Sequence, residues 1–414
     1  MIKKTKIKAS AIQYALVLIV VMALLLGGLV LFSGATRKIQ TQFQLQEEVR
    51  FNAYSGIEYG KAFANELSFN KPTQIILFER GIDSVEVTKK TWGAYQVIVS
   101  KAFHRSTRSE AVAMIGHLSE NNQPSLYLAD LGNPLGLCGK TKISGQCELP
   151  KRGVKRTYIA GQNYIGDKLI YGTTTTSKAQ LPEVNQTLLN QIHLPVLVTK
   201  RNWESEDSIV NSFVNEPLYY YESGSISIDA NYIQGQVIIE SDDSIFVSRL
   251  AQLDQVILKS PVVYFESGFE GSVQVFASHK ITLEEDVTLL YPSVLSVIET
   301  NRYESISGIE LGEGSRVLGS IFLTSETPDF RKEILLDIQE KAAVYGLAYC
   351  NGKTQLKGKV NGQLLTKKFY LKTPSSAYEN HLLNAEIIND LPADFAVIPL
   401  LGSDQKYKTV SWLK

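Results

Sequence analysis

The longest uninterrupted apolar stretch of the chain, from Ala11 to Phe32, constrains its fold more than any other feature. The only ionisable group in these 22 residues is the phenol of Tyr14. Because an α-helix rises about 1.5 Å per residue, the stretch can cross a hydrocarbon core about 30 Å thick. The sequence therefore predicts a transmembrane helix over residues 11–33.

The charges on either side of this stretch predict its orientation. Four lysines precede it within residues 1–10, whereas Arg37 and Lys38 are the nearest cations that follow. Cytoplasmic flanks carry the excess of Lys and Arg in membrane proteins. Residues 1–10 are therefore expected to be a basic cytoplasmic leader, with the rest of the chain on the other side of the membrane.

A cleaved signal peptide is the competing interpretation, because Ser33, Gly34 and Ala35 are small residues of the kind found at cleavage sites. The apolar region of a signal peptide is usually about 7–15 residues long, so the longer stretch favours a retained anchor. Both interpretations place the bulk of the chain outside the cytoplasm. Within the anchor, Gly27 and Gly28 are the candidate position for close packing against another helix.

The helical pattern continues beyond the membrane. Apolar or small residues recur at spacings near three and four from Ile39 to Ala64, and charged residues occupy the other faces. No proline occurs between Ala11 and Asn70. We therefore predict one helix of about 55 residues, half in lipid and half packed on a soluble domain.

The segment from Asn52 to Gly60 (NAYSGIEYG), together with the basic leader and the apolar-to-amphipathic helix, resembles type IV pilins and the minor pseudopilins of type II secretion. The resemblance implies a β-rich head and assembly with other pilin-like or secretion-apparatus subunits. The chain departs from the family at its leader. Ala9 and Ser10 stand where the family has its processing-site Gly, and Tyr14 or Ala15 stands where it has a Glu.

Residues 34–120 are expected to form a small α+β, pilin-like domain. Short runs with alternating apolar residues, at 73–78, 84–89, 93–101 and 110–115, predict an antiparallel meander that packs on the amphipathic helix. Trp92 is expected in the core of this domain. Residues 121–136 are rich in Asn, Pro and Gly and are expected to be a linker.

Residues 137–375 contain many short β-branched runs separated by single Gly, Ser, Asp or Asn residues. A weak apolar-x-Gly-x-apolar motif recurs in them, as at Val317 to Ile321. The strand spacing and the single corner residues favour a parallel right-handed β-helix, a solenoid, over the alternative of an antiparallel β-sandwich. The pattern is similar to that of β-helices in secreted adhesins and polysaccharide lyases. A helical insertion is expected near 177–196, and a C-terminal cap over 376–414.

The interior of this solenoid is expected to contain the alternating apolar residues of its central strands. These are Val237, Ile239, Ile245, Val247, Val256, Leu258, Val263, Phe265, Val273, Val275, Ile281 and Leu283.

The three cysteines could form a disulfide or remain free. Cys138 and Cys147 are expected to form a disulfide across a short hairpin. The alternatives are two free thiols or a metal site. Cys350 has no evident partner and is expected to be buried.

Catalytic candidates are few. Asp242-Asp243 and Glu284-Glu285-Asp286 are acidic pairs that fall in predicted turns, where such residues are common. Tyr219-Tyr220-Tyr221 could stack on sugars, although alternation between core and surface of a strand is favoured. The five His residues show no ligand spacing, so we expect no catalytic residue, cofactor or metal.

We therefore expect a non-enzymatic, single-pass protein of the bacterial inner membrane, a minor pilin-like or pseudopilin-like structural component with a periplasmic or extracellular head. The expected partners are the lipid bilayer, other pilin-like or secretion-apparatus subunits, and polysaccharide. The 42 Lys and Arg residues balance 42 Asp and Glu residues, which argues against a nucleic-acid partner. The alternatives are a surface adhesin or carbohydrate-binding module, and a polysaccharide lyase or hydrolase.

Overall fold

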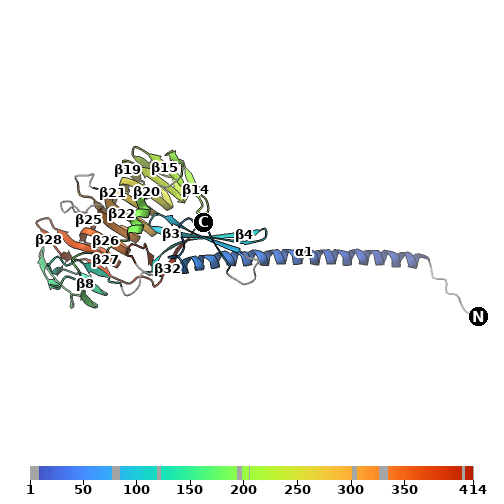
Figure 1. The fold of residues 1–414 in the computed structure, drawn as a ribbon, viewed down its shortest axis with the longest axis horizontal. Helices are drawn as coiled ribbons and strands as arrows, with labels where there is room; N and C mark the ends of the chain where they lie inside the picture. Colours follow the sequence, from blue (N-terminus) through green and yellow to red (C-terminus); the bar gives the residue numbers. More distant parts are fainter. Residues whose placement is uncertain are drawn as a thin grey trace, which may run out of the picture. The chain divides into compact units, whose positions relative to one another are not determined.

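The computed structural model describes residues 9–76, 84–118, 123–193, 198–204, 206–300, 305–325, 334–402 and 406–413. Contacts divide the chain into two units. Unit 1 comprises Met1–Glu58, Thr73–Val87 and Ser100–Ala111, and unit 2 comprises Tyr59–Pro72, Thr88–Val99 and Val112–Lys414. One long N-terminal helix is followed by a chain that is mostly β-strand (Figure 1).

The helix α1 runs from Ala9 to Ala62 without interruption, as its sequence pattern predicts. Its first part is apolar and exposed, and Val49, Ala53 and Ile57 are the first of its apolar side chains to be buried. These residues follow one another at a spacing of four, which places them on one face of the helix. The change from an exposed to a buried apolar face therefore occurs within a single helix.

The predicted meander is present in the structure. It comprises β1 (Thr73–Ile75), β2 (Ser84–Trp92), β3 (Tyr95–His104) and β4 (Thr107–Leu118), which follow one another in one sheet. Residues 77 and 78 of the first predicted strand lie outside the described residues. The C-terminal strands β31 (Ala396–Val397) and β32 (Tyr407–Leu413) pair antiparallel with β4 in the same sheet. The expected cap over 376–414 therefore differs from the structure here, because these residues complete the meander.

A second, closed sheet path joins the strands of the long β region, and its pairing is almost entirely parallel. We call the strands between Leu126 and Ile388 that pair in parallel, including those of the small neighbouring three-stranded sheet, the parallel stack. Its central strands are β15 (Leu218–Glu222), β16 (Ile226–Ile228), β17 (Tyr232–Gly235), β18 (Val237–Ser241), β19 (Ser244–Val247), β20 (Gln252–Phe265), β21 (Glu270–Leu283), β22 (Thr288–Glu299), β23 (Gly308–Leu311), β24 (Arg316–Ser325), β25 (Leu335–Ile338), β26 (Ala343–Leu356) and β27 (Lys359–Lys372).

Each of these strands pairs in parallel with a strand one to three elements later. Ile239 on β18 lies beside Leu258 on β20, and Leu258 lies beside Val275 on β21. The same relation continues through β22, β24, β26 and β27. The pairing is therefore the parallel one that the spacing predicts, and it differs from that of the antiparallel sandwich alternative.

The chain does not enter the stack at an end. The first strands of the stack are β5 (Leu126–Leu128), β6 (Leu135–Cys138) and β7 (Lys142–Ile143). They pair in parallel with β27, β29 (His381–Leu383) and β30 (Glu386–Ile388), which are its last strands along the chain. β28 (Ala377–Glu379) pairs antiparallel with β27. The expected linker over 121–136 therefore contains two strands of the stack. Its Asn, Pro and Gly residues surround strands too short to stand out in the composition.

Beyond β5–β7 the stack continues outward. β8 (Cys147–Leu149) pairs with β5, β9 (Val154–Arg156) with β6, and β12 (Thr174–Thr176) with β8. The hairpin of β10 (Tyr158–Ile159) and β11 (Gln162–Asn163) lies between them in the chain. The opposite end is formed by β13 (Lys200–Asn202) and β14 (Ser208–Asn211). Figure 1 shows β8 at one end of the stack and β14 and β15 at the other.

The strands β12 and β13, at opposite ends of the stack, are consecutive in the chain, and residues 177–193 and 198–199 are the described part of the segment between them. The helix α2 (Gln186–His193) lies in this segment, where the sequence predicts a helical insertion. Asn185 begins it, because its side-chain oxygen accepts the backbone N–H of Thr187 at 3.0 Å. Leu188 and Ile192 of α2 are buried among side chains on the outer face of the stack. The helical insertion thus packs on the outer face of the parallel stack.

The interior of the stack is one apolar cluster. All twelve side chains predicted for it belong to this cluster, and each is at most 1% exposed. The prediction of a shared interior is confirmed for these residues. Trp92 is also buried, as predicted, but it packs toward the stack: its Nε1 donates to the carbonyl oxygen of Gln255 at 3.0 Å, and its ring meets Phe213 edge-on.

Candidate functional sites

The exposed apolar part of α1 is the first candidate site. Every side chain from Ala11 to Gln44 is exposed. The most apolar window of 18 residues has a mean hydropathy of 3.1, and none of it is buried. Among the described residues, this is the helix with the length and composition to cross a membrane. An exposed apolar surface of this kind is typical of a membrane-spanning segment or of a protein–protein interface.

Gly27 and Gly28 lie within this apolar part. No heavy atom from elsewhere in the chain lies within 4 Å of the position that a Cβ would take at either residue. The surface beside them is open, so their role in packing against another helix stays a prediction.

The second candidate site is the contact between the C-terminal third of α1 and the sheet strands of unit 1. A Cβ on Gly56 would lie 2.8 Å from Val85 Cγ1 on β2 and would also overlap Ser100 on β3. Ala53 and Ile57, on either side of Gly56, are fully buried. The segment that resembles pilins is therefore the segment in which α1 packs closely on strands, and Gly56 permits the close approach.

The third candidate site is a groove of about 590 Å³ on the parallel stack. It is lined by residues of β18, β20, β21 and β22 and by Ile192 of α2. Glu240 and Lys259 are register partners on neighbouring strands, and Phe276 is the next partner after Lys259. An acidic, a basic and an aromatic side chain therefore follow one another across three neighbouring strands of the stack.

The acidic residues that line one side of this groove take part in a network of polar contacts. The Tyr219 hydroxyl donates to Glu240, and the Tyr221 hydroxyl donates to Asp242. The Lys200 ammonium lies 4.1 Å from the centroid of the Tyr221 ring. Burial, together with the hydrogen bond to Glu240, raises the pKa of Tyr219 well above its usual value, so the phenol remains protonated at neutral pH.

The other side of the groove holds groups with incomplete hydrogen bonding. Lys259 donates to the carbonyl oxygen of Ile192 at 3.2 Å, and burial lowers the pKa of its ammonium. The hydroxyls of Ser260 and Ser296 are buried and have no hydrogen-bond partner within the described chain. Because buried hydroxyls are normally paired, these two could accept and donate hydrogen bonds to a polar ligand.

The acidic pairs considered for catalysis are engaged in local contacts. Asp243 accepts a hydrogen bond from the Ser225 hydroxyl, and Asp242 accepts the one from Tyr221. Glu284 accepts the backbone N–H of Ser267 at 3.1 Å, and its hydrogen bond with Tyr264 raises the pKa of that phenol to about 12. No group of three or more His, Cys, Asp and Glu side chains is placed to hold a metal within the described ranges.

Sequence reasoning singled out Asp242 and the three tyrosines but missed Glu240, Lys200 and Lys259. These residues could have been found only from the number of residues that separates neighbouring parallel strands. Glu240 lies 21 residues after Tyr219, and Lys259 lies 19 residues after Glu240. Residues at this separation can be recognised as neighbours only when the parallel register is known.

The expected disulfide between Cys138 and Cys147 is absent. Both are free and buried, as is Cys350. Cys138 on β6 packs with Ile159 and Leu371, whereas Cys147 on β8 faces the interior of the stack. The two strands belong to different sheets, so the hairpin assumed by the disulfide prediction does not form. The prediction that Cys350 is buried is confirmed.

No protein-family model and no curated protein matches the chain. Among solved structures, the crystal structure of the competence-associated pilin ComZ from Thermus thermophilus is similar. The two chains are 9% identical, and the similarity covers 89% of this chain and 98% of the other with a TM-score of 0.28. A similarity at this level assigns neither a fold nor a function to this chain.

Proposed function

We propose that this chain is a single-pass protein of the bacterial inner membrane, a minor pilin-like or pseudopilin-like assembly component whose parallel stack is a right-handed β-helix head. The observation that supports this most directly is α1. One helix presents an exposed apolar half and then buries Val49, Ala53 and Ile57 against its own unit. One continuous helix thus combines a membrane anchor with a surface on which a folded domain packs.

The mechanism is assembly through the anchor. Transfer of the apolar residues from water into lipid stabilises insertion by about 0.8 kcal/mol for each buried methylene group. The lysines before Ala11 hold the N-terminus in the cytoplasm. At Gly27 and Gly28 the helix surface lacks side chains, so a helix of a partner subunit can approach closely. The head then stands outside the cytoplasm, and its role is structural rather than catalytic.

The anchor is tested by fractionation of cells that express the full chain and a variant lacking residues 1–36. The full chain is expected in the membrane fraction, and the shortened chain in the soluble fraction with its β-structure intact by circular dichroism. A folded head that stays with the membrane after this deletion would contradict the proposal.

Matched substitutions sharpen the test. Leu24→Arg together with Leu25→Arg places two charges in the centre of the apolar stretch, each at a cost of roughly 2.5–3.5 kcal/mol in lipid. Thr36→Arg together with Thr41→Arg adds the same charge beyond that stretch. Only the first pair is expected to release the protein from the membrane.

Processing of the leader is tested by N-terminal sequencing of the membrane-bound protein. A start at Ser10 or Ala11 indicates prepilin-type processing, and a start at Met1 indicates a plain anchor. A start at Thr36 indicates a cleaved signal peptide and removes the anchor from the proposal. Cysteine cross-linking from Gly27→Cys within the membrane then tests whether another subunit packs at this position.

The groove beside Lys259 favours a second candidate, a carbohydrate-binding role. Its unpartnered Ser260 and Ser296 hydroxyls, with Phe276 between their strands, suit a ligand that has hydroxyl groups and an apolar ring face. Binding of the full chain in detergent to a glycan array, weakened by Lys259→Met but not by Lys341→Met far from the groove, would favour this role. Release of reducing sugars from polysaccharides would favour an enzyme.

A further inference from the structure

The parallel stack ends in open strand edges on both sides. At one end, β12 pairs only with β8 and β9 only with β6; at the other, β13 pairs only with β15 and β14 only with β17, among the described strands. All side chains of β12 and β13 are exposed. Open edges present unpaired backbone N–H and C=O groups, which favour pairing with another chain.

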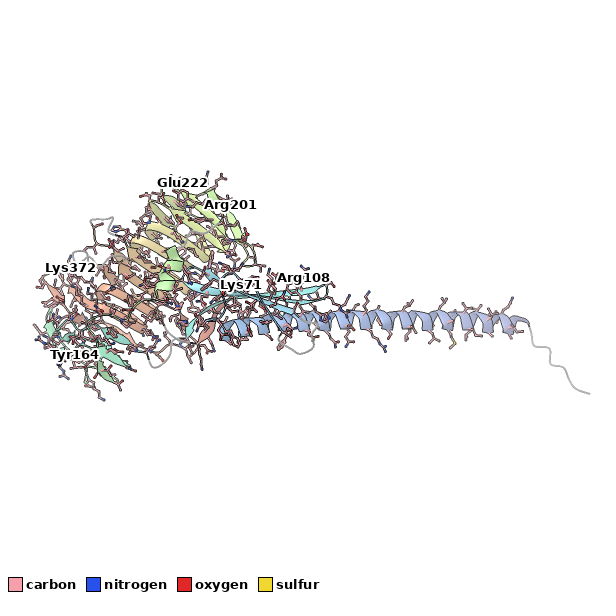
Figure 2. All side chains as sticks on the ribbon, viewed as in Figure 1. Lys71, Arg108, Tyr164, Arg201, Glu222 and Lys372 are labelled. Atoms are coloured by element: carbon pink, nitrogen blue, oxygen red, sulfur yellow. The ribbon has the colours of Figure 1, made fainter. Side chains whose placement is uncertain are left out.

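The two ends carry opposite charge. Residues 139–178, which we call the basic end, contain eight Lys and Arg residues and two acidic residues. Residues 198–251, the acidic end, contain nine Asp and Glu residues and three Lys and Arg residues, of which Lys200 and Arg201 lie on the edge strand β13. Figure 2 shows Tyr164 of the basic end on the opposite side of the stack from Arg201 and Glu222 of the acidic end. The zero net charge of the chain thus conceals a strong separation of charge.

Among the Lys and Arg side chains of the basic end, Arg156 donates to the carbonyl oxygen of Asp167 at 3.3 Å and lies over the Tyr164 ring. Lys151, Arg152 and Lys155 are exposed, and no Lys or Arg of residues 139–178 forms an ion pair within the described chain. At the acidic end, Glu204, Glu206 and Asp207 are exposed and likewise form none. Both sets are therefore available to a partner.

Exposed apolar side chains accompany the charges at each end. At the basic end, Tyr158 is 66% exposed and Ile165 is 68% exposed. At the acidic end, Val210 on the edge strand β14 is 61% exposed. Apolar and aromatic groups surrounded by charge are typical of the centre and rim of a protein interface.

We propose that the basic end of one copy docks on the acidic end of a second copy, head to tail. Because all coils of the stack run in the same direction, the outer edge of β12 in one copy and that of β13 or β14 in the next can continue the parallel pairing without reversal. Contact between two like ends would place charges of the same sign against each other. The interface is heterologous, so it leaves one free end of each kind and can add further copies. This inference does not depend on the membrane anchor.

The test uses charge reversal in the full chain, with single copies held in separate nanodiscs so that α1 cannot bring them together. The basic-end variant is Lys151→Glu, Arg152→Glu and Lys155→Glu. The acidic-end variant is Glu204→Lys, Glu206→Lys and Asp207→Lys. The control variant, Lys71→Glu, Arg105→Glu and Arg108→Glu, reverses three exposed charges outside both ends. Circular dichroism checks that each is folded.

Association is measured by analytical ultracentrifugation at low and high salt. The wild type and the control are expected to associate, with an association constant that falls at least about tenfold between 50 mM and 500 mM NaCl. Each reversed variant alone should lose association at least about tenfold, because its two ends then carry the same sign. An equimolar mixture of the two variants should associate again, since each supplies the end that the other lacks.

Three results would overturn the proposal. The first is a wild type that stays monomeric at low salt, and the second is association that both reversals leave unchanged. The third is binding of the wild type, but not of the basic-end variant, to phosphatidylglycerol vesicles without any self-association. That result would assign the basic end to an anionic membrane surface.

Discussion

The side chain of Gln274 holds the turn between β2 and β3 at Ala94. Its Oε1 accepts the backbone N–H of Ala94 at 2.8 Å, and its Nε2 donates to the carbonyl oxygen of Trp92 at 3.1 Å. Gln274 lies on β21 of the parallel stack and is 2% exposed. One buried amide therefore satisfies both backbone groups of a turn that is 180 residues away in the chain.

Replacement of this amide should destabilise unit 2. Gln274→Leu keeps the apolar volume but leaves the Ala94 N–H and the Trp92 C=O buried and unpaired, at a cost of about 2–4 kcal/mol. Urea unfolding of the detergent-solubilised chain, followed by Trp fluorescence, measures the loss. Gln252→Leu, at an exposed position of β20, is the control. Equal unfolding midpoints for the two variants would rule out this role of Gln274.

A column of glycines allows neighbouring coils to approach. Gly319, Gly346 and Gly362 are successive register partners, and all have positive φ. A Cβ on Gly346 would lie 1.9 Å from the carbonyl oxygen of Gly319. We expect Gly346→Ala to destabilise the stack by about 3 kcal/mol or more, because strain in φ adds to this overlap.

Gly224→Ala provides the comparison for Gly346, since a Cβ there meets nothing within 4 Å. Thermal unfolding monitored by circular dichroism should separate the two variants by many degrees. If Gly346→Ala unfolds at the temperature of the wild type, the close approach between coils is not required.

The stability of unit 2 should depend on pH through His117. Burial lowers the pKa of this imidazole from 6.5 to about 4, and the ring lies edge-on to Tyr407 at 4.7 Å. Between these pH values the unfolded chain binds a proton that the folded chain does not, so stability falls as the pH is lowered. This pKa difference contributes about 3 kcal/mol to the free energy of unfolding above pH 6.5, and the contribution is lost as the pH falls toward 4.

Chemical unfolding at a series of pH values measures this dependence. His117→Phe should retain the ring contact with Tyr407 and flatten the slope between pH 6.5 and 4. His381→Gln, at a partly exposed position, should keep the slope. An unchanged slope in His117→Phe would assign the pH dependence to other groups.

The three cysteines should be unreactive in the folded protein. All are buried free thiols, and burial raises the pKa of Cys147 and of Cys350 to about 11. Since the thiolate is the reactive form, a thiol reagent at pH 8 should label none of them before unfolding and all three afterwards. A disulfide detected by mass spectrometry in the purified native chain would contradict the structure.

Local patterns in the sequence determined the elements of this fold. The apolar stretch and its amphipathic continuation predicted α1, because a period near 3.6 is a property of a single segment. The alternation of apolar residues likewise predicted which side chains of 237–283 face the interior. The motif at Val317 to Ile321 pointed to Gly319, and residues 344–348 fit the same pattern around Gly346, but only the register shows that the two glycines are neighbours.

The arrangement of these elements was decided by the tertiary structure. Leu126, assigned to a linker by its composition, pairs with Leu364, and Tyr407 near the C-terminus pairs with His117. Tyr219, Glu240 and Lys259 meet because each lies one coil from the next. The opposite charges of the two ends also depend on which coils are terminal. Hydrophobic periodicity specifies which face of a strand is buried, but the partner of that strand is set by register and packing between distant segments, and no local pattern encodes it.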